Sequence, residues 1–220
     1  RVITGEEEAR LSAQGVLLGW PGAYGLICDI GGSSMELVEI QGGTVGKCVT
    51  SHLGPLKLKD IKGGRQGRKK HIDEVMLSLR DQMGDQRDRL FLVGGSWRAI
   101  ARLDMLRRSY PLTVQHEYRM TAKDVRETAK FIEKNDLDKL RSDCGISSTR
   151  MALVPYAIDV LSRLVKTFRP KDIAISSYGL REGLLYEQMP DRLRERDPLI
   201  EAARFAEAKD ARLPGFGKTL

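Results

Sequence analysis

The chain has 220 residues, of which 41% are hydrophobic and 30% are charged, and its formal net charge is +7. These proportions are ordinary for a folded domain, and no apolar run approaches the ~18 residues that a membrane span needs. The three cysteines, Cys28, Cys48 and Cys144, are far apart and form no CxxC pair. Their spacing disfavours a disulfide framework or a zinc site and indicates a reducing, cytoplasmic location. Because the chain starts at Arg1, without an initiator Met, we expect it to be part of a longer protein.

The N-terminal residues predict a helix from about Gly5 to Gly15. Three consecutive glutamates fall in its first turn, where the helix dipole favours negative charge. The third of them, Glu8, shares a helical face with Leu11 and Leu18, whereas the other two do not. We therefore expect Glu8 to point inwards and its two neighbours to face solvent.

Three strand-like runs follow the helix, and short glycine-containing turns separate them. The runs are Leu26–Ile30, Glu36–Ile40 and Thr44–Thr50. Runs of this length with short turns between them predict an antiparallel meander.

A tight turn joins the first two of these runs, and a carboxylate stands on each side of it. The turn consists of Gly31, Gly32, Ser33 and Ser34. Glycine lets backbone N–H groups come close to an anion, so the turn predicts a phosphate site. The flanking carboxylates of Asp29 and Glu36 cannot bind phosphate themselves, but a divalent cation could lie between them and the phosphate.

The next segment concentrates the positive charge of the chain. It holds one acid and seven bases: Lys57, Lys59, Lys62, Arg65, Arg68, Lys69 and Lys70. Three glycines in the same stretch favour a mobile, solvated loop. The charge would also attract a polyanion, although nucleic acid is disfavoured because the segment has no aromatic side chain on which bases could stack.

The remaining chain alternates helices with two further strands. In chain order we predict a helix Ile72–Gly84, a strand Arg89–Val93, helices Trp97–Leu106 and Met120–Asn135, an irregular stretch Arg141–Thr149, a helix Met151–Phe168, a strand Asp172–Ser176 and a helix Leu180–Met189. Three antiparallel strands followed by two right-handed crossovers predict an α/β lobe with a five-stranded mixed sheet and helices on its faces. Ligands should bind beyond the ends of the parallel strands.

Three motifs, in this order and spacing, resemble the exopolyphosphatase / guanosine pentaphosphate phosphatase family. They are TGEEEAR from Thr4, DIGGSSMELV from Asp29 and GLREGLLYE from Gly179. The family is similar to actin, hexokinase and the sugar kinases, which have two ribonuclease H-like lobes around a cleft. The resemblance implies that residues 1–190 form the second lobe and that a first lobe precedes them. It also implies that residues 191–220 form a linker and the start of a following helical domain.

The resemblance assigns roles to individual residues. It implies that Glu8 orients or deprotonates the attacking water and that Asp29 and Glu36 are associated with Mg²⁺. The phosphate would lie on the turn Gly31–Ser34, and Gly94, Gly95 and Ser96 match the place where kinase relatives hold adenosine. The family usually has a third glycine and a threonine in the turn. Here Ser33 and Met35 replace them, which we expect to tune the turn without removing the site.

The resemblance implies Mg²⁺-dependent release of the terminal phosphate from inorganic polyphosphate, and it also implies a homodimer. Three alternatives stay open at this point. The substrate could be the 5′ terminal phosphate of guanosine pentaphosphate, the protein could be an ATP-dependent kinase of the same superfamily, or this lobe could bind phosphate without catalysis. No guanosine pocket is recognisable in the sequence, and the motif TGEEEAR argues against the kinase.

Overall fold

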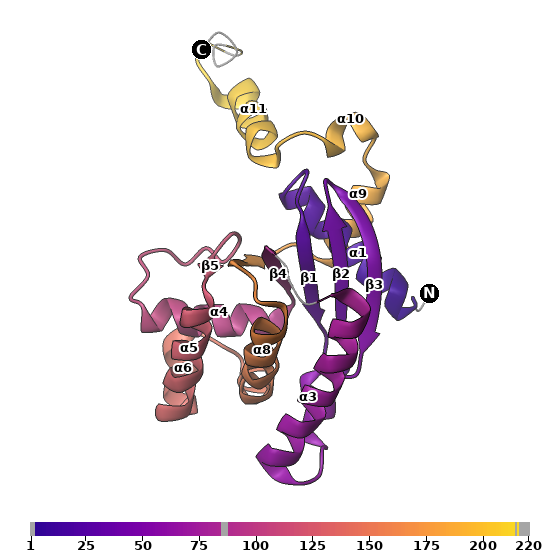
Figure 1. Cartoon of the computed structure of the whole chain (residues 1–220). Helices are drawn as coiled ribbons and strands as arrows, with labels where there is room; N and C mark the ends of the chain where they lie inside the picture. Colours follow the sequence, from indigo (N-terminus) through magenta and orange to yellow (C-terminus); the bar gives the residue numbers. More distant parts are fainter. Residues whose placement is uncertain (1–2, 85–87, 214, 216–220) are drawn as a thin grey trace.

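The computed structural model describes residues 3–84, 88–213 and 215, and its centre is a six-stranded mixed sheet (Figure 1). The strands lie in the order β3-β2-β1-β4-β6-β5. Strands β1, β4 and β6 are parallel, whereas β2, β3 and β5 run antiparallel to their neighbours. Their bounds are β1 (Gly25–Ile30), β2 (Met35–Gln41), β3 (Thr44–Ser51), β4 (Arg89–Val93), β5 (Arg119–Met120) and β6 (Asp172–Ser176).

The predicted mixed sheet is confirmed, but the count of five strands is one too low. The missing strand is β5, which consists of two residues paired with Ala174 and Ile173 of β6. A pair of residues is too short to show the alternation of apolar and polar side chains by which a strand is recognised in a sequence.

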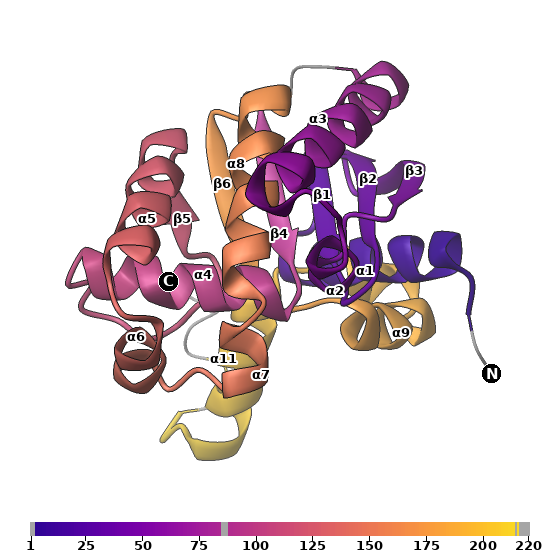
Figure 2. The same cartoon turned by 90° about the horizontal axis from the view of Figure 1, so that it is seen from below.

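Helices cover both faces of the sheet (Figure 2). Helices α1 and α9 lie on one face, and α3, α4, α5 and α8 lie on the other. The prediction of an irregular stretch Arg141–Thr149 is partly wrong, because that stretch contains the end of α6 and the start of α7. The helices are α1 (Gly5–Gly19), α2 (Pro55–Lys59), α3 (Gly64–Met83), α4 (Gly95–Arg107), α5 (Ala122–Lys134), α6 (Leu137–Cys144), α7 (Ser148–Met151), α8 (Val154–Phe168), α9 (Leu180–Gln188), α10 (Asp191–Arg194) and α11 (Pro198–Asp210).

Strand β1 shows how the two faces differ. Successive side chains of a strand point to opposite faces. Leu26 and Cys28 belong to the large apolar core under α3 and α8, and Ile27 belongs to the smaller core under α1. Asp29 therefore lies on the α1 side of the sheet, at the end of the strand.

The prediction of a mobile basic loop is wrong, because this segment forms α2 and the first turns of α3. Pro55 starts α2, a position that suits proline because it lacks an N–H group. In α3, the Arg68 guanidinium donates to Asp159 of α8 at 3.0 and 3.1 Å and lies 4.7 Å from the centre of the Tyr156 ring. These contacts with α8 hold a helical start that glycines disfavour.

The C-terminal helices differ from the body of the molecule. Helix α11 has no buried residue and extends away from the sheet (Figure 1). The predicted limits at residues 1 and 220 lie outside the described part of the chain. Within that part, no helix has the length and apolar character needed to cross a membrane.

Candidate active site

Two carboxylates face each other where β1 and β2 meet the turn. Asp29 is directly opposite Glu36 in the antiparallel pair, and such partners have Cβ atoms about 4.5–5.5 Å apart. Like charges in this arrangement repel. Glu36 is only 1% exposed, and neither of its carboxylate oxygens forms a hydrogen bond of normal geometry with a described residue. This like-charged pair, in which Glu36 is buried without a normal hydrogen bond, is the feature of the sheet that most needs a functional explanation.

Both carboxylates hold their protons more tightly than usual. Burial raises the pKa of Asp29 to about 6, against the effect of the Ser12 hydroxyl, which donates to Asp29 Oδ2. Burial also raises the pKa of Glu36 to about 7, and the charges of Asp29 and Glu8 add to this rise. The Ser34 side chain lies close enough to favour the ionised form of Glu36, and so lowers its pKa.

The third carboxylate, that of Glu8, comes from α1. Its charge raises the pKa of both Asp29 and Glu36, so it lies within electrostatic reach of both. Glu8 is half-buried and Glu6 is exposed, as the helical-face argument predicts, but Glu7, which was also expected to face solvent, is half-buried as well. Sequence reasoning missed Ser12, which is fully buried one turn further along α1. Its position four residues after Glu8, on the same helical face, is the signal that could have identified it.

Two glycine contacts hold α1 against α9. A Cβ atom on Gly15 would lie 2.1 Å from the Gly179 carbonyl oxygen, and one on Gly183 would lie 1.8 Å from the Leu11 carbonyl oxygen. The two helix backbones therefore touch, and only glycine fits at these positions. This contact fixes the part of α1 that carries Glu8 and Ser12.

The glycine turn has a defined shape. The Gly31 N–H donates to the Ser34 carbonyl oxygen at 3.0 Å, so it closes the turn and is not directed at a ligand. Within the described structure, the N–H groups of Gly32 and Ser33 have no hydrogen-bond acceptor. Ser33 does not have a positive φ, so serine fits here without strain although the family usually has glycine.

The start of α2 supports the turn from behind. The Leu56 N–H donates to the Gly32 carbonyl oxygen at 2.8 Å, and a Cβ atom on Gly54 would lie 2.2 Å from the Ser33 carbonyl carbon. Gly54 is thus required for this close approach. Sequence reasoning missed this support, although the Gly54-Pro55 pair is a recognisable helix start.

The segment after β4 lies on the opposite side of the turn. Gly94 has a φ of +117°, and a Cβ atom there would lie 2.6 Å from the Ile30 carbonyl oxygen. The guanidinium of Arg150, on α7, lies over Gly95. A pocket of about 290 Å³ joins Gly31 and Gly32 to Gly95, Ser96, Ser147, Thr149 and Arg150. The structure thus brings the turn and the predicted nucleotide segment together in one pocket.

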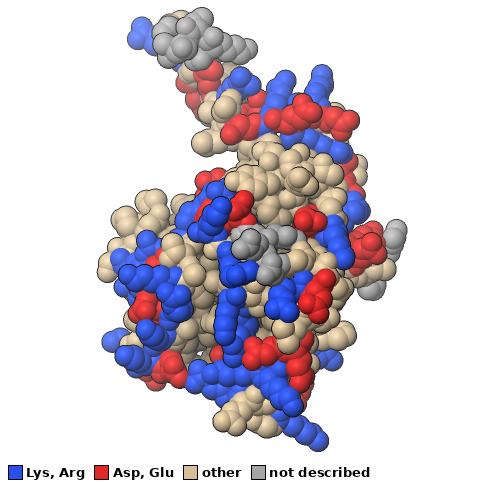
Figure 3. All heavy atoms as spheres, viewed as in Figure 1, with Lys and Arg blue, Asp and Glu red and all other residues tan. Residues whose placement is uncertain are grey.

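The basic residues of the predicted polyanion segment are divided between two roles. Three of them form ion pairs: Arg65 with Glu133 at 2.6 Å, Arg68 with Asp159 at 3.0 Å and Lys70 with Glu74 at 3.9 Å. Lys57, Lys59 and Lys62 are exposed on or just after α2, and Lys69 is half-buried on α3. Figure 3 shows how densely Lys and Arg cover the face of the molecule around α3.

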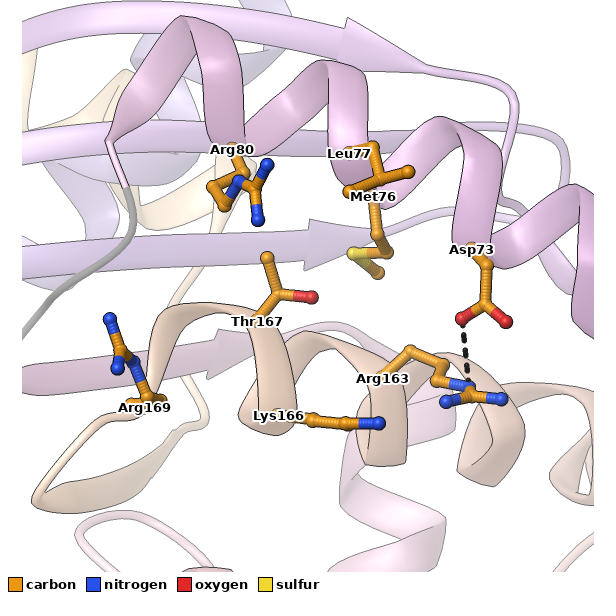
Figure 4. Close-up of a pocket in the computed structure, with 8 residues that line it drawn as sticks. All are labelled: Asp73, Met76, Leu77, Arg80, Arg163, Lys166, Thr167 and Arg169. Atoms are coloured by element: carbon orange, nitrogen blue, oxygen red, sulfur yellow. Dashed lines mark ion pairs between the residues drawn. The ribbon is translucent and has the colours of Figure 1, made fainter.

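A separate hollow of about 480 Å³ lies between α3 and α8 (Figure 4). It is also basic, but Arg163 is paired with Asp73 at 3.0 Å. It shares no lining residue with the pocket at the turn, so we do not include it in the candidate site. Its lining residues are Asp73, Met76, Leu77, Arg80, Arg163, Lys166, Thr167 and Arg169.

The carboxylates fit a magnesium ion better than a closed metal cage. The described residues contain no group of three or more His, Cys, Asp and Glu arranged to hold a metal. Magnesium is commonly held by one or two carboxylates, together with waters and phosphate oxygens of the substrate. The unsatisfied oxygens of Glu36 and the adjacent Asp29 match that donor set.

Comparisons with known proteins agree with the fold described above. A solved structure of the Ppx/GppA family member from Aquifex aeolicus has 21% sequence identity and a TM-score of 0.70, with 86% of this chain and 63% of that chain covered. A solved exopolyphosphatase from Cytophaga hutchinsonii has 22% identity and a TM-score of 0.75, with 85% and 64% covered. These similarities confirm the predicted α/β, ribonuclease H-like fold class. The chain spans less than two thirds of the length of these relatives.

The model of the Ppx/GppA phosphatase family matches residues 1–192, which is most of the chain. This match covers all three motifs on which the resemblance was based. The chain belongs to the Ppx/GppA phosphatase family.

Proposed function

We propose that the protein containing this chain is an exopolyphosphatase, which hydrolyses the terminal phosphoanhydride bond of inorganic polyphosphate. The observation that carries the proposal is the position of three carboxylates, those of Glu8, Asp29 and Glu36, beside a turn with two unused N–H groups. Two neighbouring carboxylates with little solvent around them destabilise a fold, so their presence here is better explained by a function than by a contribution to stability.

The turn and Glu8 have complementary roles in this proposal. The N–H groups of Gly32 and Ser33 hold oxygens of the terminal phosphoryl group, where charge is concentrated during transfer. Glu8 accepts a hydrogen bond from the attacking water and orients it in line with the bond that breaks. Lys57, Lys59 and Lys62 attract the rest of the polyanion to this end of the molecule.

Asp29 and Glu36 would hold Mg²⁺, which when bound would neutralise charge on the phosphoryl group. Because their pKa values are about 6 and 7, both carboxylates are almost fully ionised only above about pH 8. Metal binding and activity should therefore increase as the pH rises from 6 to 8. The first lobe, which precedes this chain in the proposal, completes the cleft.

The test uses the full-length protein with its first lobe. Phosphate release is measured from long-chain polyphosphate and from guanosine pentaphosphate, each with Mg²⁺ and with EDTA. We expect Mg²⁺-dependent release from polyphosphate, and a loss of kcat of about 10²- to 10⁴-fold in Glu8→Gln, the range for a group that transfers or positions a proton. Glu6→Gln is the matched control, because it changes an exposed glutamate of the same helical turn.

The proposal has two separate ways to fail. Activity restricted to the nucleotide would show that the substrate is wrong while the chemistry stands. A Glu8→Gln enzyme as active as the Glu6→Gln control would show that another group positions the water.

A further inference from the structure

A second pocket, of about 300 Å³, adjoins the pocket at the glycine turn. The two share Ser147 and Arg150 in their linings, so they lie side by side on the surface. The second pocket extends from Arg150 to Arg98 and Arg102, which both lie on α4. It therefore places three arginines in a row that starts at the candidate phosphate site.

Among the described residues, no ion pair with an acid neutralises the charge of these three arginines. The charge of Arg98 nevertheless acts on the Asp29 carboxylate and lowers its pKa. Arg98 is half-buried, and its pKa is lowered first by burial and then by the charges of Arg150, Arg181 and Arg102. The nearby Glu182 acts in the opposite direction, but its carboxylate accepts a hydrogen bond from the Gly179 N–H at 2.8 Å.

The donors of these side chains are largely unused. The Arg98 Nη1 atom lies 3.5 Å from the Ser177 carbonyl oxygen, and the Arg102 Nη1 atom lies 3.4 Å from the Gly145 carbonyl oxygen. Both distances exceed those of a good N–H···O hydrogen bond. The hollow between α3 and α8 differs, because there Asp73 neutralises Arg163.

We propose that Arg98, Arg102 and Arg150 form a second anion subsite, which binds the phosphates that follow the terminal one in a condensed phosphate chain. The proposal rests on the proposed function, because it places the terminal phosphate on the Gly32-Ser33 turn. Guanidinium groups suit this ligand, since their planar fork can donate two hydrogen bonds to one phosphate. A linear chain of phosphates would pass from the pocket at the turn, past Arg150, to the adjoining pocket at α4.

The experiment measures binding rather than turnover. Inorganic tripolyphosphate and orthophosphate are titrated by calorimetry into the full-length protein carrying Glu8→Gln, which prevents hydrolysis. Arg98→Gln and, separately, Arg102→Gln are added to this background. The matched control is Arg80→Gln, an exposed arginine in the hollow between α3 and α8.

We expect each change to weaken tripolyphosphate binding at least about tenfold, while orthophosphate binding changes less than twofold. The Arg80→Gln control should bind both anions as the parent does. Because Arg102 is exposed, its replacement tests the proposal even if Arg98→Gln fails to fold. Unchanged tripolyphosphate affinity in Arg102→Gln, or an equal loss for orthophosphate, would overturn the subsite.

A nucleotide arm identifies the source of the phosphate chain. A selective loss for tripolyphosphate supports a subsite for the inorganic polymer, and a similar loss for guanosine triphosphate supports one that accepts nucleotide phosphates as well. Failure of the proposed function would give a different result. Tripolyphosphate binding would depend on the arginines as expected, but the wild-type protein would release no phosphate.

Discussion

The two faces of the sheet are built for different tasks. Under α3 and α8 the contacts are made by large apolar side chains, such as Leu90 and Leu92 of β4 and Phe168 of α8. Under α1 the helices approach through glycine, and the end of the sheet carries Asp29 and Glu36. One face thus supplies most of the buried apolar surface, and the other carries the two carboxylates of the candidate site. The apolar packing on one side of these strands therefore stabilises the fold enough to hold the carboxylates on the other side.

The largest expected effect lies on the apolar face. Phe168 is fully buried at the end of α8, so Phe168→Ala should lower the free energy of unfolding by about 3–5 kcal/mol. Because no site residue is touched, kcat per folded molecule and its pH profile should stay unchanged. Denaturant unfolding and phosphate release measure the two quantities. A changed pH profile would show that the two faces are not independent.

A change on the other face should affect stability and chemistry together. In Gly183→Ala the new Cβ atom would lie 1.8 Å from the Leu11 carbonyl oxygen, so α1 and α9 must separate. We expect a loss of about 3 kcal/mol in the free energy of unfolding. Activity should fall in the folded molecules as well, because α1 carries Glu8.

The control for this change is Gly42→Ala, at a turn where a Cβ atom meets nothing within 4 Å. It should cost only about 1–2 kcal/mol, from the positive φ of Gly42, and should leave kcat unchanged. Equal effects of the two replacements on kcat would contradict the role given to the α1–α9 contact.

The smallest effect has the opposite sign. In the absence of divalent cations, Glu36→Gln should raise the free energy of unfolding at pH 8 by about 2 kcal/mol. The replacement removes a buried charge, and a pKa raised from 4.5 to about 7 means that this charge costs up to about 3 kcal/mol of stability. A raised pKa means that the folded state binds the proton more tightly than the unfolded chain does. The wild-type protein should therefore lose this stability as the pH rises from about 4.5 to 7, and the variant should lose less.

Unfolding by urea at pH 4 and pH 8, with EDTA, measures this contrast. Below about pH 4.5 the variant and the wild type should differ little, since Glu36 is protonated in both states. Adding Mg²⁺ at pH 8 should stabilise the wild type and not the variant. A variant that is less stable than the wild type at pH 8 would show that Glu36 has a stabilising partner.

Sequence patterns predicted the parts of the fold in which local signals are strong. The runs at β1 to β4 and β6 and the turn at Gly31 were found because apolar runs and glycines mark them directly. The basic segment was predicted to be a loop because its glycines favour a loop more strongly than Pro55 indicates a helix start. The packing of Arg68 on α8 stabilises the helix, but this contact is long-range and leaves no local signal in the sequence. The arginine pocket was not predictable for the same reason, since Arg98 and Arg150 come from two helices that only the fold brings together.

The contact between α1 and α9 has a consequence for the order of events during synthesis. Gly15 lies near the start of the chain and Gly179 near its end, so nearly the whole lobe must be translated before they can meet. Loops of that size close late and slowly compared with local turns. A growing chain on the ribosome would thus form its glycine turn long before the helix that bears Glu8 could be fixed in place, so the two parts of the candidate site should come together only late in the folding of this lobe.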